Sequence, residues 1–446
     1  MILLKSSHAL RESCGAQRNS FARAGAPKQR GLALLVVVLM ALGLLAGVLA
    51  IGFAGDLIRQ NQRQQRTTDA LAQAKEALIG YAARDAQRPG SLPCPDTDNN
   101  GGAESPFPSE CPGYVMGSDV YLGRLPWRTL GLPDLRDSSG ERLWYAVSRQ
   151  FARNPSCMPN CPLTSDTLGQ LTVTGITPTS NAVAIIFAPG TTLGSQSRGI
   201  ANENTATNYL EGENADGNNP TFATAADSST FNDRLLALTN ADLMPAVERR
   251  VAREMLRILE AYKAATGVYP WADRADGNSD GAEGSQAWNH SRFPCGDALP
   301  TNWGSGGTPS LPGWLRDSCT NPVTGWTSVI FYAVARNRLQ NSGTGCTNCT
   351  ASTLTVTNSS NGIADLCLTG VTPFVCTPTV VSSGSADLVL ITPGAATTIR
   401  AGGWPSSSFG AITGYFEDSE NSDNNDDNYV VPSSNNNDRD RIYIVR

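Results

Sequence analysis

The residues best suited to chemistry are aspartates, asparagines and glutamates in glycine-rich stretches. Asp96-x-Asp98-x-Asn100-Gly101 and Asp276-x-Asn278-x-Asp280-Gly281 place an oxygen-bearing side chain at every second position. Ca²⁺ takes six to eight oxygen ligands from flexible loops of this kind. Both stretches lack the glutamate that would complete an EF-hand loop. Hydrated turns are the alternative, because Asp, Asn and Gly are also the usual turn residues.

Two further acidic stretches lie later in the chain, at residues 211–219 and 417–428. They offer the same oxygen ligands, and the same two interpretations apply to them. Calcium is therefore the one possible cofactor that the sequence indicates. The candidate ligands are Asp96, Asp98, Asn100, Glu211, Glu213, Asp216, Asp276, Asn278, Asp280, Glu417, Glu420 and Asp423.

The cysteines favour a disulfide framework. The chain has 11 cysteines, and all but Cys14 follow residue 31. An even number of closely spaced cysteines is typical of proteins that fold in an oxidising compartment. Zinc is the less favoured alternative, because His290 is the only histidine beyond the first 31 residues. Pairing by proximity gives Cys94–Cys111, Cys157–Cys161, Cys295–Cys319, Cys346–Cys349 and Cys367–Cys376.

Catalysis finds little support in the sequence, and we expect no enzyme. The chain contains no G-x-S-x-G, H-E-x-x-H, P-loop or G-x-G-x-x-G motif. A pair of carboxylates for glycoside hydrolysis stays open, because sequence does not show the distance between them. The net charge is −6 and the first 31 residues contribute +5, so the remainder carries −11. An acidic chain of this kind argues against a nucleic-acid partner.

Two amphipathic helices are expected to position these loops. Residues 56–86 contain no proline, and Leu71, Ala74 and Leu78 recur at helical steps. Residues 242–266 show a similar apolar stripe, with Pro245 in the first turn, where proline is tolerated. Each helix precedes a proline-rich loop with a cysteine.

An internal repeat relates the segments that follow the two helices. Several short motifs recur in the same order, which is the signature of a duplicated module. The clearest matches are Leu92-Pro93-Cys94 with Phe293-Pro294-Cys295, Tyr145-Ala146-Val147 with Tyr332-Ala333-Val334, Ala188-Pro189-Gly190 with Thr392-Pro393-Gly394, and Glu213-Asn214-Ala215-Asp216 with Glu420-Asn421-Ser422-Asp423.

Short β-branched and aromatic runs predict the strands of each module. The predicted fold class is α+β, with each helix packed on a small antiparallel sheet. The expected strands are 143–148, 171–174 and 183–187 in the first module, and 329–334, 354–357 and 388–391 in the second.

The first part of the chain predicts a membrane-spanning helix. Residues 32–54 carry no charge, and as a helix they would be long enough to cross a ~30 Å hydrocarbon layer. The preceding residues carry six basic side chains against Glu12. This asymmetry predicts a single-pass protein with a cytoplasmic N-terminus and periplasmic modules.

The junction Lys28-Gln29-Arg30-Gly31-Leu32 and the helix after it resemble type IV prepilins and type II secretion pseudopilins. The resemblance implies that a prepilin peptidase cuts after Gly31 and leaves Leu32 as the new N-terminus. Most members carry Glu at the fifth mature position, where this chain has Val36, so the resemblance is to minor, tip-type members. Such heads bind calcium through acidic loops. A secretory signal peptide or a plain signal anchor is the alternative to this processing.

The predicted organisation is a leader at 1–31, a membrane and amphipathic helix at 32–86, and head modules at 87–239 and 240–446. The predicted function is a minor pilin or pseudopilin-like subunit in, or at the tip of, a bacterial filament. Its expected partners are other pilin subunits through the N-terminal helix, the prepilin peptidase and the inner membrane. The alternative is a membrane-anchored binding protein or adhesin outside any filament.

Overall fold

The computed structural model describes most of two compact units of the chain. They comprise Met1–Gln62 and Arg63–Arg446. The described residues are 30–105, 111–112, 118–152, 163–272, 290–294, 310–315, 326–339, 353–358, 361–368, 374–394, 421, 427–432 and 440–446.

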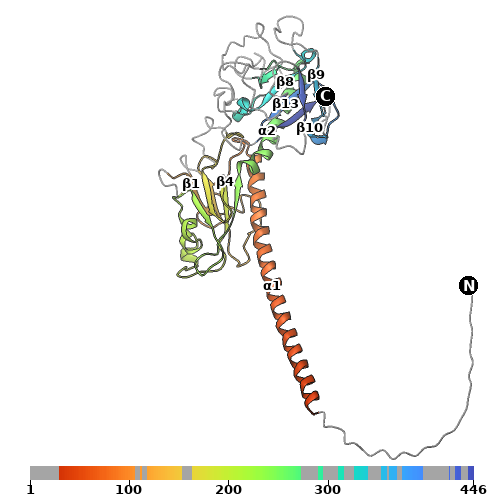
Figure 1. Cartoon of the computed structure of the whole chain (residues 1–446). Helices are drawn as coiled ribbons and strands as arrows, with labels where there is room; N and C mark the ends of the chain where they lie inside the picture. Colours follow the sequence, from red (N-terminus) through yellow and green to blue (C-terminus); the bar gives the residue numbers. More distant parts are fainter. Residues whose placement is uncertain are drawn as a thin grey trace, which may run out of the picture. The chain divides into compact units, whose positions relative to one another are not determined.

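Helix α1 (Arg30–Arg84) is continuous from the apolar stretch into the amphipathic stripe (Figure 1). Its sequence has no proline, so no backbone donor is lost along its length. In the unit that begins at Arg63, the buried side of α1 repeats at helical steps and includes Leu71, Ala74 and Leu78. The predicted amphipathic stripe is therefore the packing face of this helix.

The predicted membrane-spanning helix over residues 32–54 is contradicted. Within the part of the chain that the structure describes, no helix is both long enough and apolar enough to cross a membrane. The prediction of a single-pass inner-membrane protein with periplasmic modules rested on that helix and is contradicted as well.

The first sheet has the order β1-β2-β4-β3-β5, and β6 also pairs with β4. The central strand β4 is long enough to pair with β3 near its start and with β2 and β6 further along. The strands are β1 (Val120–Arg124), β2 (Trp144–Ser148), β3 (Leu171–Gly175), β4 (Thr179–Ala188), β5 (Thr221–Thr224) and β6 (Arg234–Thr239).

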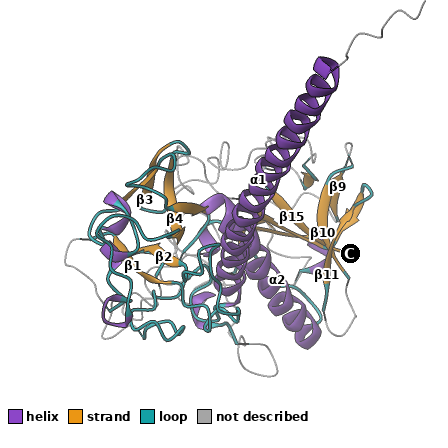
Figure 2. Ribbon diagram, turned by 90° about the horizontal axis from the view of Figure 1, so that it is seen from below, coloured by secondary structure: helices purple, strands orange, loops and turns teal. Residues whose placement is uncertain are grey.

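The second sheet has the order β11-β10-β15-β13-β8-β7, and a smaller third sheet has the order β12-β9-β14. Figures 1 and 2 label most of these strands. The second sheet contains β7 (His290–Arg292), β8 (Phe331–Val334), β10 (Ile363–Cys367), β11 (Cys376–Val380), β13 (Leu388–Thr392) and β15 (Arg441–Val445). The third contains β9 (Leu354–Thr357), β12 (Gly384–Ala386) and β14 (Asn428–Val430).

The predicted fold class is wrong in two respects, the membrane helix and the purely antiparallel sheets. The structure is mixed α/β: β3–β5, β10–β15 and β9–β14 are parallel pairs. The six predicted strands overlap β2, β3, β4, β8, β9 and β13, because local patterns locate strands, whereas the other nine strands of the described residues were not predicted. The direction of pairing depends on long connections, such as the one from β3 to β5, that local patterns do not encode.

Helix α2 (Asn240–Thr266) follows β6 without an intervening loop. Thr239 ends the strand and caps the helix: its side chain accepts from the Asp242 amide, and the Asp242 carboxylate accepts from the Thr239 amide. The helix ends at Gly267, whose φ of 84° gives the left-handed terminus that glycine adopts without strain.

The core is built on both faces of the sheets. Along β4, Ala184 and Ile186 belong to the large cluster that includes the buried sides of α1 and α2, whereas Ile185 and Phe187 belong to a smaller cluster with Phe222. Strand alternation sends neighbouring side chains to opposite faces, so β4 is apolar throughout because both of its faces are covered.

One predicted match of the internal repeat differs in the structure. The Leu92 amide donates to the Phe151 carbonyl at 2.8 Å, and the Tyr269 amide donates to the Arg338 carbonyl at 2.8 Å. The neighbouring prolines match as well: Tyr145 donates to the Pro93 carbonyl at 3.3 Å, and Tyr332 donates to the Pro270 carbonyl at 2.8 Å. Tyr269-Pro270 is thus the structural counterpart of Leu92-Pro93, not the predicted Phe293-Pro294. The sequence match followed the Pro-Cys pair, which carries no information about these backbone contacts.

The α2 cap gives a stability prediction. Thr239→Ala should lower the free energy of unfolding by about 1 kcal/mol, because the substitution leaves the Asp242 amide without its side-chain acceptor. Urea unfolding followed by circular dichroism measures the change. Thr207→Ala, at an exposed position, is the matched control. Equal stability of the Thr239 variant and the control would contradict a stabilising cap.

Candidate functional site

The loop after α1 has a fixed backbone. Asp96 exchanges two backbone hydrogen bonds with Arg124, of 3.0 and 2.8 Å. Asn99 and Gly101 have positive φ angles of 60° and 84°. A Cβ at Gly101 would lie 2.5 Å from the Trp127 ring, so only glycine fits this turn. The alternating sequence of the loop therefore serves a defined turn rather than a flexible one.

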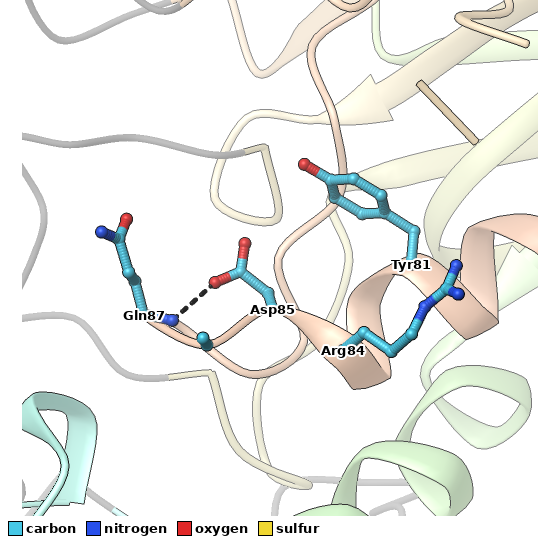
Figure 3. Close-up of a pocket in the computed structure, with 5 residues that line it drawn as sticks. Tyr81, Arg84, Asp85 and Gln87 are labelled. Atoms are coloured by element: carbon cyan, nitrogen blue, oxygen red, sulfur yellow. Dashed lines mark hydrogen bonds between the residues drawn. The ribbon is translucent and has the colours of Figure 1, made fainter. Parts of the chain in front are cut away.

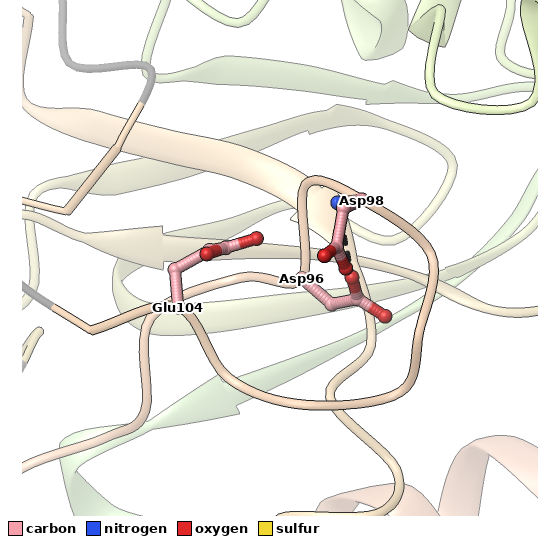
Figure 4. A group of neighbouring side chains, drawn as sticks. All are labelled: Asp96, Asp98 and Glu104. Atoms are coloured by element: carbon pink, nitrogen blue, oxygen red, sulfur yellow. Dashed lines mark hydrogen bonds between the residues drawn. The ribbon is translucent and has the colours of Figure 1, made fainter.

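Three carboxylates meet in this loop: Asp96, Asp98 and Glu104 (Figure 4). Each offers an oxygen, and these oxygens lie within 4.8 Å of one another. Asn100 lies next to the group: its side-chain amide donates to the Asp98 carboxylate at 2.7 Å, and its side-chain oxygen accepts from the Gly102 amide at 2.6 Å. The structure thus brings the two aspartates of the first predicted calcium stretch together with Glu104 and keeps Asn100 beside Asp98.

Glu104 is the residue that sequence reasoning missed. The EF-hand pattern directs attention to the sixth residue after the glycine, and Glu104 is the third after Gly101. Its carboxylate accepts from the Thr97 amide at 3.1 Å and from the Thr97 hydroxyl at 2.7 Å, which holds it against the loop. A search for any acid close to the alternating stretch would have found it.

The hydrogen bonds around Asp96 also explain the carboxylates without an ion. Asp96 accepts from the Gly101 amide at 2.6 Å and from the Asp98 amide at 3.2 Å. Burial raises the pKa of Asp96, and its contact with Asp98 raises it further, while the Gly101 amide opposes the shift. A cation between the carboxylates would relieve the cost of crowding buried negative charge.

Two arginines support the far side of the loop. The Arg124 guanidinium lies 4.3 Å from the Trp144 ring centroid and 4.0 Å from that of Tyr209. Burial between the rings lowers its pKa to about 10. Arg142 donates to the carbonyl and side-chain oxygens of Asn99 at 2.9 and 3.0 Å. The Arg142 contacts hold the turn at Asn99 without occupying the carboxylates of Asp96, Asp98 and Glu104.

Calcium is expected to stabilise the protein through this group. Adding millimolar Ca²⁺ to metal-free protein should raise Tm, since a ligand at 100 times its Kd adds about 2.7 kcal/mol to stability. The double variant Asp98→Asn/Glu104→Gln should lose the shift, and Asp166→Asn at an exposed position should keep it. Mg²⁺ should have a smaller effect because it requires stricter octahedral geometry. An unchanged Tm with Ca²⁺ would reduce the group to a hydrogen-bonded turn.

The predicted ligands of the later loop do not converge. Glu213 and Asp216 are exposed, and Glu211 is buried and faces another partner. The Glu211 carboxylate accepts from the amides of Asn232 and Asp233 at 3.0 and 3.1 Å. In return, the Asp233 carboxylate accepts from the Glu211 amide at 2.9 Å. This reciprocal pair satisfies buried backbone donors, which is a structural task.

One buried asparagine in each module, Asn214 and Asn421, makes the same kind of contact with a strand backbone. Asn214 accepts from the Ala223 amide and donates to the Ala223 carbonyl, at 2.8 and 3.1 Å. Asn421 accepts from the Val430 amide and donates to the Val430 carbonyl, both at 2.9 Å. Both side chains are buried. Each asparagine side chain therefore forms with one backbone residue the pair of hydrogen bonds that a neighbouring strand would otherwise form.

Asp233 gives a pH prediction. Burial raises its pKa to about 8, and the nearby Glu211 charge adds to the shift. The folded state therefore binds a proton that the unfolded state releases above about pH 4, so this group makes stability fall as pH rises towards 8. Asp233→Asn should weaken that decline, as measured by urea unfolding from pH 4 to 8. Asp216→Asn, at an exposed position, should follow the unmodified protein, and parallel curves for all three proteins would contradict the assignment.

The remaining predicted ligands lie outside the described residues: Asp276, Asn278, Asp280, Glu417, Glu420 and Asp423. The predicted processing residues Gly31 and Leu32 lie within α1, but the surroundings of their side chains are outside the described part of the structure.

Two of the predicted disulfides are present, Cys94–Cys111 and Cys367–Cys376. The first joins the loop of Asp96 to residue 111, and the second joins β10 to β11. Cys94–Cys111 thus closes the loop that contains Asp96, and Cys367–Cys376 closes the connection between β10 and β11. The cysteines of the other predicted pairs lie outside the described residues: Cys157, Cys161, Cys295, Cys319, Cys346 and Cys349.

A cavity of about 440 Å³ lies at the end of α1 (Figure 3). It is lined by Tyr81, Arg84, Asp85 and Gln87, together with Ala86. Asp85 accepts from the amides of Gln87 and Arg88 at 2.8 and 2.9 Å, so its carboxylate closes the turn after the helix. The Asp85 carboxylate is therefore part of the helix terminus.

The comparisons with known proteins give no relative on which to base a function. No family model, no curated protein and no solved structure matches this chain.

Proposed function

We propose that this chain is an assembly subunit of the minor pilin or pseudopilin kind, which associates with other subunits through the first part of α1. The observation that carries the proposal is a run of exposed apolar side chains. Leu35, Val37 and Leu44 are 59%, 63% and 73% exposed. Val36, Val38, Leu39, Met40, Leu42 and Leu45 are exposed as well.

Exposed apolar area of this extent favours a partner, because a monomer in water rarely leaves so many large apolar side chains uncovered. The exposure extends around the helix rather than along one stripe, so the expected covering is several neighbouring helices. Helices of other pilin-like subunits have this chemistry. Packing of the apolar segments in a bundle would bury area on each subunit.

The sequence supports a minor or tip position in such an assembly. Val36 stands where the resembled family usually has Glu. The unit Arg63–Arg446 contains three sheets among its described residues, and its bulk favours an end over the interior of a stack. The Arg30-Gly31-Leu32 junction adds processing by a prepilin peptidase, with Leu32 as the first residue of the mature subunit.

Assembly is tested with Val37→Asp/Leu44→Asp in cells that contain a pilus or type II secretion machine. The variant should lose most of its recovery, about tenfold or more, from the sheared filament fraction, because charge at these positions opposes helix packing. Gln62→Asp/Gln65→Asp, at exposed polar positions of the same helix, is the matched control. N-terminal sequencing of the recovered protein should begin at Leu32. A different mature N-terminus, with normal recovery of the charged variant, would overturn the proposal.

A further inference from the structure

Helix α2 carries four arginines outside its buried side. A cavity of about 330 Å³ lies against this side of the helix. Its charged lining residues are Arg249, Arg250, Arg253, Glu254 and Arg257, and its uncharged ones are Ala246, Phe374 and Cys376. Ala246, Arg250, Arg253 and Arg257 follow one another at steps of four, three and four residues. They therefore form one stripe of the helix, in which three guanidinium groups lie beside a small side chain.

Two acids are paired with these arginines. The Asp365 carboxylate on β10 lies 2.8 Å from Nη2 of Arg253 and 3.5 Å from Nε of Arg249. The Glu254 carboxylate accepts from Nη2 and Nε of Arg257, at 2.7 and 3.1 Å. Four positive charges therefore meet two negative ones, and the cavity keeps a surplus of two positive charges.

Arg250 is the arginine without an anion. Within the part of the chain that the structure describes, its guanidinium forms no hydrogen bond and no ion pair, and its Nη1 atom is buried. The guanidinium lies 5.5 Å from the centroid of the Trp314 ring. Burial lowers the pKa of Arg250, while the charges of Glu254 and Asp85 oppose the shift. A half-buried cation without an acceptor is unfavourable, so an anion in the cavity would stabilise it.

The charge of the surrounding unit limits the size of that anion. The chain carries −6 and its first 62 residues carry +5, so Arg63–Arg446 carries −11. An acidic unit repels an extended polyanion such as nucleic acid, and it repels an anionic membrane surface. A single small anion meets mainly the local surplus of the arginines.

The local charge favours a phosphate group over a carboxylate. A carboxylate brings one negative charge and leaves one of the two surplus charges unbalanced. A phosphate group carries about −1.5 to −2 at neutral pH and offers three acceptor oxygens. The planar guanidinium of arginine forms paired hydrogen bonds with oxygens of this kind.

We propose that the arginine cavity of α2 binds the phosphate group of a small soluble molecule. Arg250 supplies the unpaired charge. Arg253 and Arg257 donate from the same stripe through Nη1, because their hydrogen bonds to Asp365 and Glu254 use the other guanidinium nitrogens. The site lies on α2, so it does not depend on the proposed association through the first part of α1.

Calorimetric titration of the full chain with inorganic phosphate at constant ionic strength tests the site. At pH 8, phosphate should bind at least about tenfold more tightly than acetate, because it brings a second charge. Lowering the pH to about 5.5 should weaken phosphate, which then takes up a proton, and should leave sulfate unchanged, since sulfate keeps both charges. Equal affinities for phosphate and acetate would overturn the proposal.

Variants of opposite sign separate the site from nonspecific binding. Arg250→Gln should weaken phosphate binding about tenfold or more, and Arg250→Lys should restore part of the loss. Arg66→Gln, at an exposed position of α1 outside the cavity, is the matched control. Glu254→Gln should tighten phosphate binding about threefold, because it removes a negative charge beside Arg257, and a folding defect does not produce such a gain. Unchanged affinity in both Arg250→Gln and Glu254→Gln would count against the site.

Vesicles distinguish a lipid headgroup from a soluble phosphate. Cosedimentation with vesicles of phosphatidylcholine and phosphatidic acid should be the same for the unmodified chain and for Arg250→Gln, because the acidic unit is repelled by an anionic surface. Loss of cosedimentation in Arg250→Gln, together with no binding of phosphate in solution, would contradict the soluble ligand.

Discussion

The junction at Thr239 is the constraint on which much of the unit Arg63–Arg446 depends. This residue ends β6 and caps α2, so the edge strand of the first sheet and the second long helix share a fixed direction. Lys75 of α1 adds a third element, because its ammonium contacts Asp242 at 2.9 Å and the Ala237 carbonyl at 3.3 Å. Two helices and one strand are therefore oriented by a few polar contacts at the rim of an apolar core. Helix α2, which starts at this junction, buries 12 of its 27 residues.

Buried carboxylates have a common task in the first module. Asp96, Glu211 and Asp233 each accept backbone amides that no strand or helix pairs with. Burial raises the pKa of Asp96 and of Asp233, because a buried negative charge is unfavourable. The hydrogen bonds that these carboxylates accept from buried backbone amides offset that cost. The three carboxylates differ in how this cost can be lowered. A cation could bind Asp96 together with Asp98 and Glu104, whereas Glu211 and Asp233 each accept a hydrogen bond from the other's backbone amide.

Strands β6 and β15 differ in their neighbours among the described residues, because β15 pairs with both β13 and β10 and β6 pairs with β4 alone. Arg249 and Arg253 make it possible for β10 to place Asp365 against α2. The exposed apolar side chains of α1 between Leu35 and Leu45 are the surface on which the proposed association with other subunits depends.

The sequence by itself determined the local elements. Strands such as β2 and β4 and the two helices follow from periodicity, and the closeness of Cys94 to Cys111 and of Cys367 to Cys376 was enough to predict their pairing. The tertiary structure decided what depends on contacts between distant residues. It set the parallel pairing of β3 with β5, brought Glu104 to Asp96 and Asp98, and removed Glu211 from the candidate ligands by pairing it with Asp233. It also matched Tyr269 with Leu92 through backbone contacts that residue types do not reveal. Periodicity reports which face of an element is apolar, but the partner of that face is chosen by the path of the whole chain.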